Sequence, residues 1–400
     1  IIGYANNVTI EADCRVNSNV TGDVAYTGGI AGKWIGNDTS QMPGQRRVQS
    51  NVYIVGESYV GGLVGWLDAK NTKGFTVNPF ITNGTQNPIR VTGTSYVGAL
   101  YGGVEGYGYK RNSQNASADD SRVYINPSTT GEGIYVRVNL KSGGHVAGGL
   151  IGYASGVGVL FLGDWTGLDH TPVSFEGTTS FFGGIIGVLG ENATIESAMN
   201  TSNGVSVGGV THTLRFRSTQ SAFDIEVNGD FVGSIAGYIA SSAGTFLAQD
   251  TNIMGNTVKL FNNSQIKGRS FVGGIFGAIG KVASEHYVVT NGVNENIFAD
   301  DYLINLIRYG SYGAQATGPN TTLRYAPSDD GGLGKVFNYS PIPASGDFAG
   351  GIVGYAGANT LLAFFNPVVS GSESNFSLND AASYLNVYNG YGNNPTAGDT

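Results

Sequence analysis

Cysteine, charge and unbroken apolar runs are all scarce in this 400-residue chain. The single cysteine, Cys14, excludes a disulfide framework and a cysteine-based metal site. Charged residues make up only 12% of the chain and the net charge is −8, so there is no basic stripe that could neutralise nucleic-acid phosphates. The uncharged stretches 147–163 and 348–369 are broken by Gly, Ser, Asn or Pro, which argues against a membrane span. We therefore expect neither a nucleic-acid partner nor a membrane span.

The compact motifs of common catalytic and metal sites are also missing. The chain has no HExxH pair, no phosphate loop and no GxSxG elbow. Its acidic pairs at 119–120, 300–301 and 329–330 lack the alternate-position spacing of a calcium loop. The four histidines are isolated from one another: His145, His170, His212 and His286. We expect no catalytic residue, no metal and no cofactor.

What is abundant is glycine, with 64 residues, alongside an aromatic share of 11%. Disorder would need fewer aromatic residues and more charge, and collagen would need a strict Gly-X-Y period. Alternation of apolar and polar residues, as in Val136–Leu140 and Phe223–Val227, is typical of half-buried strands. Only residues 300–308 show helical spacing, which is compatible with a short helix. These features predict an all-β, glycine-punctuated protein.

One seven-residue phrase recurs along the chain: aromatic, small or β-branched, Gly, small, Ile or Leu, variable, Gly. Its eight copies are YTGGIAG at 26–32, YVGGLVG at 59–65, YVGALYG at 96–102, VAGGLIG at 146–152, FFGGIIG at 181–187, FVGSIAG at 231–237, FVGGIFG at 271–277 and FAGGIVG at 348–354. Successive copies start 33 residues apart at the closest (26 to 59) and 77 at the widest (271 to 348). A fixed phrase with connections of variable length is typical of a repeat protein.

The glycines of the phrase predict a tight corner, which needs either a positive φ angle or a very close approach of two backbone segments. The glycines that we assign to this structural role are Gly29, Gly62, Gly149, Gly184, Gly274 and Gly351. The apolar residue that follows should point into one shared core, in every copy: Ile30, Leu63, Leu100, Leu150, Ile185, Ile235, Ile275 and Ile352.

The phrase resembles the GLUG-motif repeats of bacterial and archaeal surface proteins, and residues 1–32 are the closest match. This resemblance implies a parallel β-solenoid (β-helix) with irregular loop excursions, exposed at the cell surface, and brings no catalytic residues. It predicts a β-repeat domain over 1–360, with a long insertion or a degenerate unit at about 281–347. A C-terminal part, 361–400, would hold further strands and a tail rich in Tyr, Asn and Gly.

These expectations favour an extracellular structural or adhesive protein, such as the subunit of a self-assembling filament or an adhesin stalk. Its partners would be further copies of itself, joined through the end coils or a donated strand, and surface glycans. Candidate glycosylation sites are the sequon residues Asn7, Asn19, Asn37, Asn83, Asn115, Asn192, Asn200, Asn262, Asn320 and Asn375. The alternative is a carbohydrate-active β-helix enzyme, a polysaccharide lyase or glycosidase, using carboxylates such as Glu176, Asp224 or Glu226.

Overall fold

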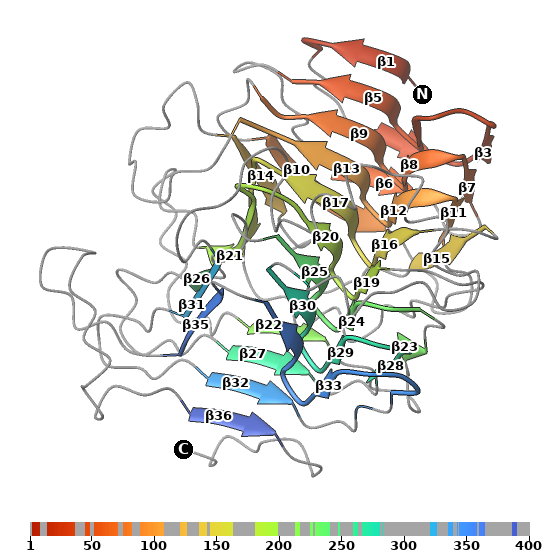
Figure 1. Cartoon of the computed structure of the whole chain (residues 1–400). Helices are drawn as coiled ribbons and strands as arrows, with labels where there is room; N and C mark the ends of the chain where they lie inside the picture. The colour runs from red at the N-terminus through yellow and green to blue at the C-terminus, as the bar shows by residue number, and fades with distance from the viewer. Residues whose placement is uncertain are drawn as a thin grey trace, which may run out of the picture.

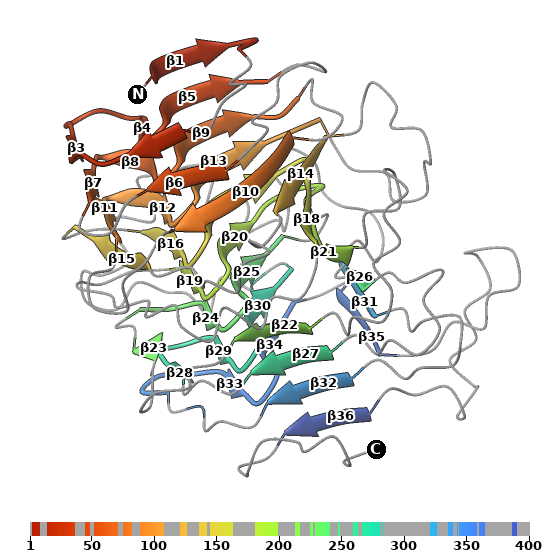
Figure 2. The same cartoon turned by 180° about the vertical axis from the view of Figure 1, so that it is seen from behind.

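The computed structural model shows an all-β protein whose strands form long parallel sheets (Figures 1 and 2). It describes residues 2–8, 14–36, 45–48, 52–70, 75–81, 89–107, 121–125, 136–141, 145–162, 181–198, 213–216, 225–226, 229–240, 247–248, 259–262, 266–280, 282, 321–325, 335–338, 342, 344–357, 360–364 and 386–389. Within these ranges there is no helix, and hence none that could cross a membrane. The all-β prediction is confirmed, while the segment 300–308 lies outside the described residues.

The longest sheet, here sheet I, has nine strands in the order in which they follow one another along the chain. Its strands are β1 (Ile2–Asn6), β5 (Ala31–Ile35), β9 (Val64–Asp68), β13 (Tyr101–Glu105), β17 (Ile151–Ser155), β20 (Ile186–Leu189), β25 (Ala236–Ile239), β30 (Phe276–Ile279) and β34 (Val353–Ala356). Each strand after the first begins inside one copy of the phrase.

Sheet II has eight strands, and each of them contains the second and third residues of one phrase copy. Its strands are β4 (Thr27–Gly28), β8 (Ser58–Gly61), β12 (Ser95–Gly98), β16 (Val146–Gly148), β19 (Phe181–Gly183), β24 (Val232–Gly233), β29 (Val272–Gly273) and β33 (Ala349–Gly350). The fourth and fifth residues of the phrase, such as Gly62 and Leu63, form the bend that connects a strand of sheet II to the next strand of sheet I.

Two further sheets lie mainly in the N-terminal half. Sheet III consists of β2 (Cys14–Val16), β6 (Gln45–Val48), β10 (Phe75–Ile81), β14 (Arg122–Ile125), β18 (Gly158–Leu162), β21 (Thr194–Ala198) and β26 (Leu247–Ala248). Sheet IV consists of β3 (Val20–Thr21), β7 (Tyr53–Val55), β11 (Ile89–Gly93) and β15 (Val136–Leu140). The segment Val136–Leu140, predicted from its alternation, is thus a strand.

Three smaller sheets occur toward the C-terminal end. Sheet V consists of β22 (Thr213–Phe216), β27 (Lys259–Asn262), β32 (Lys335–Asn338) and β36 (Asn386–Asn389). The strands β23 (Ile225–Glu226) and β28 (Ile266–Lys267) form one pair, and β31 (Thr321–Tyr325) and β35 (Thr360–Phe364) form another.

The chain runs in circuits, and each circuit adds one strand to sheet I and one to sheet II. In the first four circuits it passes from sheet I through sheet III and sheet IV to sheet II, and the phrase returns it to sheet I. All neighbouring strands are parallel, and identical phrase positions stand side by side, as in Gly61 beside Gly98. The circuits stack from β1 at one end to β36 at the other (Figure 1). This arrangement is compatible with a parallel β-solenoid.

The core lies inside the circuits. The fifth residue of the phrase is buried in the first seven copies, from Ile30 to Ile275, and half-buried in the last, at Ile352. Large side chains such as Trp34, Tyr101 and Phe276 are fully buried in the same core. The prediction that the phrase supplies one shared apolar column is confirmed for the described residues.

The phrase copies that start at 271 and 348 are direct neighbours although 77 residues separate them. Val272 pairs with Ala349 in sheet II, and Phe276 pairs with Val353 in sheet I. In the part of the chain that the structure describes, the intervening residues therefore add no strand to either of these two sheets.

Candidate functional site

The bend of the phrase is tied to the next circuit by backbone hydrogen bonds. The amide of Gly29 donates to the carbonyl of Gly62 at 3.2 Å, and that of Gly184 donates to Gly233 at 3.0 Å. The equivalent amides of the other assigned glycines donate as follows: Gly62 to Gly98 (3.3 Å), Gly149 to Gly183 (2.9 Å) and Gly274 to Gly350 (3.2 Å). Gly351 lies in the corresponding bend between β33 and β34. At this fourth position a side chain is accepted in two copies, as Ala99 and Ser234, and Ser234 Oγ donates to Gly274 O at 2.6 Å.

The third and seventh phrase positions are glycine in every copy, because two backbone segments approach each other there. A Cβ on Gly65 would lie 2.5 Å from the carbonyl oxygens of Gly32 and Tyr59, and one on Gly152 would lie 2.5 Å from the carbonyl carbon of Tyr96. Real Cβ atoms do not approach backbone this closely. The glycines thus let the strands of sheets I and II pack directly on each other.

Positive φ angles occur at the first phrase position and not at its glycines, among the described residues. Tyr59, Tyr96, Phe231, Phe271 and Phe348 have φ between 49° and 64°, whereas the only glycines with positive φ are Gly156 and Gly280. Of the two reasons that the sequence offered for glycine at the corner, close backbone approach is therefore the one found among the described phrase residues, and positive φ is not. The left-handed conformation costs an aromatic residue about 1–3 kcal/mol, which packing must offset.

Packing offsets that cost by stacking the same aromatic rings on one another. The ring centroids of Tyr59 and Tyr96 are 4.6 Å apart with an interplanar angle of 4°, and those of Phe231 and Phe271 are 4.5 Å apart at 6°. The column is interrupted at Val146, which occupies the aromatic position of the fourth copy. Stacked pairs of this kind contribute about 0.5–1.5 kcal/mol beyond the apolar area that they bury.

A second column consists of the residues of sheet I directly after the phrase, and from Trp66 onward it alternates large and small side chains. In register along the sheet it reads Tyr4, Lys33, Trp66, Gly103, Tyr153, Val188, Tyr238, Ala278 and Tyr355. From Trp66 onward each large ring packs against the first column where two circuits meet. Tyr238, for example, contacts both Phe181 and Phe231 at centroid distances of 6.0 Å. Phrase copies are therefore joined in pairs, with one bridging ring for each pair.

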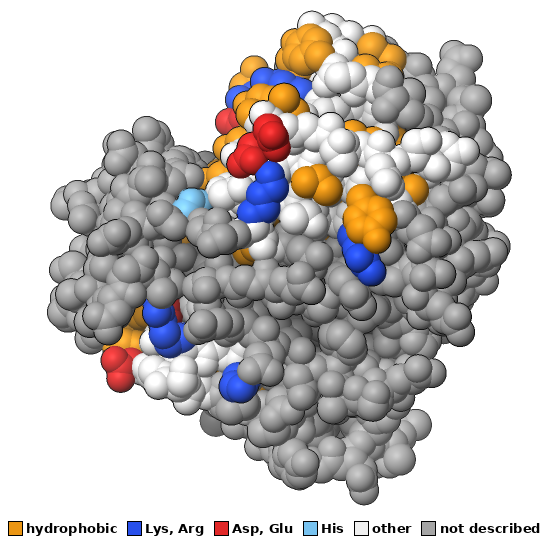
Figure 3. Space-filling view, turned by 90° about the vertical axis from the view of Figure 1, so that its right-hand side faces the viewer, with side chains coloured by type: hydrophobic (Ala, Val, Ile, Leu, Met, Phe, Trp, Pro, Cys, Tyr) orange, Lys and Arg blue, Asp and Glu red, His pale blue; other side chains and the backbone are white. Residues whose placement is uncertain are grey.

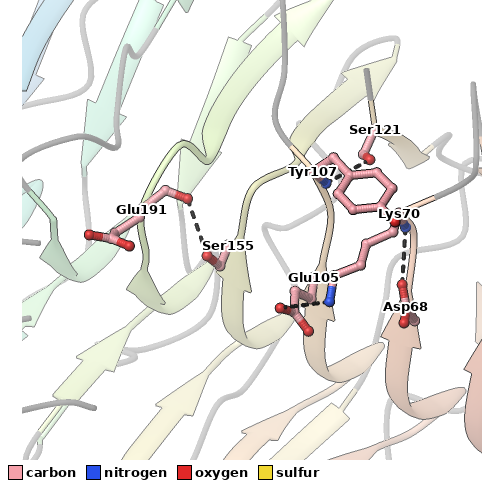
Figure 4. Close-up of polar contacts among 7 residues, drawn as sticks. All are labelled: Asp68, Lys70, Glu105, Tyr107, Ser121, Ser155 and Glu191. Atoms are coloured by element: carbon pink, nitrogen blue, oxygen red, sulfur yellow. Dashed lines mark hydrogen bonds and ion pairs between the residues drawn. The ribbon is translucent and has the colours of Figure 1, made fainter. Parts of the chain in front are cut away.

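Carboxylates end consecutive strands of sheet I (Figure 4). Asp68 and Glu105 are in register on β9 and β13, which places their Cα atoms about 4.8 Å apart. Glu105 forms an ion pair with Lys70 at 3.0 Å, while Asp68 Oδ1 accepts a hydrogen bond from the Lys70 amide at 3.1 Å. Partial burial lowers the pKa of Lys70, but its hydrogen bond to Glu105 and the charges of Glu105 and Asp68 outweigh this, so the pKa is raised.

Hydroxyl groups continue this edge beyond the carboxylates. Ser155 is in register with Glu105, and its hydroxyl donates to the carbonyl of Glu191 at 3.2 Å. The buried Ser121 hydroxyl accepts a hydrogen bond from the amide of Tyr107 at 3.0 Å (Figure 4). This edge of sheet I therefore carries carboxylate, lysine and hydroxyl groups. Most of the hydrogen bonds that these groups form involve a backbone atom.

A second polar network joins four consecutive circuits at the corner between sheets IV and II. Lys141 Nζ lies 2.6 Å from Glu57 Oε1 and 3.7 Å from Asp23 Oδ1, and Thr94 Oγ1 donates to Glu57 Oε2 at 3.0 Å. The hydrogen bond from Lys141, together with that from Thr94 and the charge of Lys141, lowers the pKa of Glu57. The network binds the circuits together along the stack.

A third ion pair lies just before two phrase copies. Arg269 Nε donates to Asp230 Oδ1 at 2.8 Å, and its Nη2 donates to Asp230 Oδ2. Asp230 is buried and Arg269 is partly buried. The hydrogen bonds to Asp230 raise the pKa of Arg269 despite this burial. The pair makes a fork-shaped link between adjacent circuits.

Three of the sequon residues lie on the described surface. Asn7 and Asn192 are exposed and have positive φ angles of 53° and 52°, as expected in a turn. Asn19 is exposed and its Oδ1 accepts a hydrogen bond from the amide of Tyr53 in the next circuit at 3.0 Å. Asn262 is the last residue of β27. The remaining candidates lie outside the described residues: Asn37, Asn83, Asn115, Asn200, Asn320 and Asn375.

Few of the other sequence candidates fall in the described part. Glu226 ends β23, whereas Glu176 and Asp224 lie outside, as do the three acidic pairs. His145 is half-buried beside sheet II, and the other three histidines lie outside the described residues. Within those residues no group of three His, Cys, Asp or Glu could hold a metal ion.

Sequence reasoning missed the carboxylate edge and the Glu57–Lys141 network. The first had a detectable signal, because Asp68, Glu105 and Ser155 each stand three residues after the last glycine of a phrase. The second had none, since Glu57 and Lys141 are 84 residues apart and meet only through the register of sheet IV. Comparison with protein-family models, curated proteins and solved structures gives no match.

Proposed function

We propose that this chain is an extracellular structural or adhesive protein built as a parallel β-solenoid of GLUG-like repeats. In this proposal it is the subunit of a surface filament or adhesin stalk, carries glycans on its exposed sequons and is not an enzyme. In this role the protein would be a stiff body that keeps its shape under mechanical load. Its lateral faces would be exposed to the surroundings.

The observation that carries the proposal is the continuity of the ladders along the stack. Sheets I and II pair one strand per circuit through at least eight strands, and the bends of the phrase add hydrogen bonds between circuits. Aromatic stacking and the Glu57–Lys141 network run in the same direction. Pulling along the stack would have to separate these contacts circuit by circuit, which suits a load-bearing element.

Self-association would use the outermost strands. Among the described residues, sheet I ends at β1 on one side and at β34 on the other. An outermost strand carries backbone groups that another chain can pair with. A head-to-tail contact of this kind, if it does not close into a ring, produces a filament.

Electron microscopy of the purified native protein tests this proposal. We expect filaments whose axial repeat is close to the length of one subunit, and we expect their number to rise with protein concentration. Isolated short particles at every concentration would contradict self-assembly. Mass mapping of peptides that contain Asn7 and Asn192 tests the glycan part of the proposal independently of assembly.

The carbohydrate-active alternative retains one supporting observation, the register pair Asp68 and Glu105. Retaining glycosidases place two carboxyl groups about 5–5.5 Å apart, which neighbouring strands can provide. Against it, Glu105 is already held by Lys70 at 3.0 Å. Reducing-sugar release from a panel of polysaccharides, compared between the native protein and Asp68→Asn, decides the question: activity that the substitution abolishes would establish the enzyme.

A further inference from the structure

Four side chains gather where strands β9 and β13 leave sheet I (Figure 4). Asp68 and Glu105 are in register as the last residues of the two strands. Two residues further along each strand, Lys70 and Tyr107 take equivalent positions. The backbone ladder continues past the strands, since the Ala69 amide donates to the Glu105 carbonyl at 2.6 Å. The four side chains, here called the edge cluster, therefore form two rows of two on neighbouring circuits.

Tyr107 is fixed at its backbone while its ring faces solvent. Its amide donates to the hydroxyl of the fully buried Ser121 at 3.0 Å. The preceding Gly106 is tightly packed, since a Cβ there would lie 2.2 Å from the carbonyl oxygen of Gly156. Tyr107 itself is 59% exposed, and its ring stacks on no other ring among the described residues. An aromatic ring held in this way loses little conformational freedom when it binds a ligand.

The edge cluster also has polar atoms that no described residue uses. Lys70 Nζ pairs with Glu105 Oε1 at 3.0 Å, and Asp68 Oδ1 accepts a hydrogen bond from the Lys70 amide at 3.1 Å. The second oxygen of each carboxylate and the Tyr107 hydroxyl have no hydrogen-bond partner within the described part of the chain. The side chains of Lys70 and Glu105 are 30% and 37% exposed, so a ligand can reach them.

Two other carboxylates in ion pairs, Glu57 and Asp230, have both oxygens bound. Glu57 lies 2.6 Å from Lys141, and its other oxygen accepts a hydrogen bond from Thr94 at 3.0 Å. Arg269 donates to both oxygens of Asp230. Figure 3 shows the side of the molecule on which the strands of sheet I begin, and the few described acidic side chains there lie close to Lys or Arg side chains. The edge cluster lies at the other ends of these strands and differs in having a free oxygen on each carboxylate.

The chemistry of the edge cluster favours a neutral ligand that is rich in hydroxyl groups. Its two carboxylates oppose an anion and its ammonium opposes a cation, because like charges brought together at an interface are costly. Carboxylate oxygens only accept hydrogen bonds and an ammonium only donates them, whereas a sugar hydroxyl does both. Adjacent hydroxyls of one sugar ring can therefore bind Asp68, Glu105 and Lys70 together. The apolar face of the same ring can pack on the ring of Tyr107.

We propose that the edge cluster binds one neutral sugar unit of a surface glycan. The free oxygens of Asp68 and Glu105 accept hydrogen bonds from two adjacent sugar hydroxyls. Lys70 donates to one of these hydroxyls, and Tyr107 packs on the sugar ring. The two rows are about 4.8 Å apart and two residues of extended chain cover about 6.6 Å, which suits a single pyranose ring. The inference rests on the proposed adhesive function and adds to it a binding site and a ligand class.

The test is saturation-transfer NMR of the full chain with the methyl glycosides of glucose, galactose and mannose. We expect saturation transfer to at least one of the three, strongest at the protons of the face that packs on Tyr107. The corresponding uronic acid and amino sugar should bind more weakly, because each brings a charge that the edge cluster opposes. Lys70→Gln should raise the affinity for the amino sugar, a change that a purely structural role of Lys70 would not produce.

Substitutions locate the binding site. Asp68→Ala should weaken binding about tenfold, as expected for the loss of a hydrogen bond to a charged group. Tyr107→Ala should weaken it about fivefold, whereas Tyr107→Phe retains the ring and should stay close to the native value. The matched control is Tyr4→Ala, because Tyr4 is 58% exposed on β1 and lies outside the edge cluster. It should leave the dissociation constant within about twofold of the native value. Circular dichroism of each variant establishes that the fold is retained.

Three results would overturn the inference: no saturation transfer to any of the three glycosides, tighter binding of either charged sugar to the native protein, or an equal loss in Tyr4→Ala and Tyr107→Ala. Filament formation is measured separately on the same variants. Filaments without sugar binding would reject this site and leave the proposed structural function standing, whereas sugar binding without filaments would reject self-assembly alone.

Discussion

The indole ring of Trp66 lies directly against Gly103 on the neighbouring strand of sheet I. A Cβ on Gly103 would be 2.5 Å from Cε3 and 2.6 Å from Cζ3 of the indole. The large ring therefore uses the space that the missing side chain leaves. Position 103 therefore requires glycine because its neighbour on the adjacent strand, Trp66, is large.

Gly103→Ala should accordingly destabilise the protein by about 1–3 kcal/mol, the usual cost of overpacking a well-filled site. Chemical denaturation monitored by circular dichroism measures it. Because the cause is the indole, the penalty should shrink by about 1 kcal/mol or more when Gly103→Ala is made in a Trp66→Leu background. An equal penalty in both backgrounds would mean that the indole is not responsible.

Gly152→Ala should destabilise the protein more than Gly3→Ala, although both glycines occupy the same register position of sheet I. A Cβ on Gly152 would be 2.5 Å from the carbonyl carbon of Tyr96, a backbone atom that cannot move aside, whereas a Cβ on Gly3 meets nothing within 4 Å. We expect a loss of about 3 kcal/mol or more for Gly152→Ala and less than about 0.5 kcal/mol for Gly3→Ala. Similar melting temperatures for the two variants would contradict the close-approach explanation.

Tyr101→Phe should stabilise the protein. The Tyr101 side chain is fully buried, its hydroxyl has no hydrogen-bond partner among the described residues, and burial raises its pKa. Removing an unsatisfied buried hydroxyl should gain about 1–2 kcal/mol. The matched control is Tyr238→Phe, because the equally buried Tyr238 hydroxyl donates to Gly280 O at 2.9 Å and its removal should cost about 1 kcal/mol. A loss of stability in both variants would show that the Tyr101 hydroxyl is satisfied.

The contribution of Glu57 to the free energy of unfolding should depend on pH. Its pKa is lowered in the folded protein, chiefly by the hydrogen bond from Lys141, so its contribution is complete above the unfolded pKa of about 4.3 and is lost as the pH falls through the folded value. The difference in stability between the native protein and Glu57→Gln should therefore narrow between about pH 5 and pH 3. Asp23→Asn, at a side chain that is 91% exposed, should leave the pH profile nearly unchanged. A constant difference across this range would contradict the role of the charge.

The repeat phrase made much of the fold predictable. Eight copies of one frame predicted that equivalent residues stack, and the register of Val60 beside Val97, or of Gly61 beside Gly98, follows from aligning the copies. The burial of the fifth phrase residue, for example Leu63, follows in the same way because one apolar position repeats among glycines. Local sequence sufficed wherever the structure repeats itself.

The remaining features depend on register between segments that differ in length. Arg90 stands six residues before its phrase and Arg137 nine before the next one, so alignment of the phrases does not bring the two together. The left-handed conformation of Tyr59 was equally hidden, because an aromatic residue gives no local signal for positive φ and stacking on its neighbours compensates the cost. These relationships therefore appear only once the sheets are assembled.

From Trp66 onward, the alternation of large and small residues in the second column gives the stack a period of two circuits. Inserting or deleting a single circuit would set two bulky rings on neighbouring strands, or two small residues with a void between them. Inserting or deleting two circuits together would leave the alternation intact. In this part of the stack the number of circuits can thus change only in even steps without repacking, and a lengthened or shortened version should be designed there in units of two phrases.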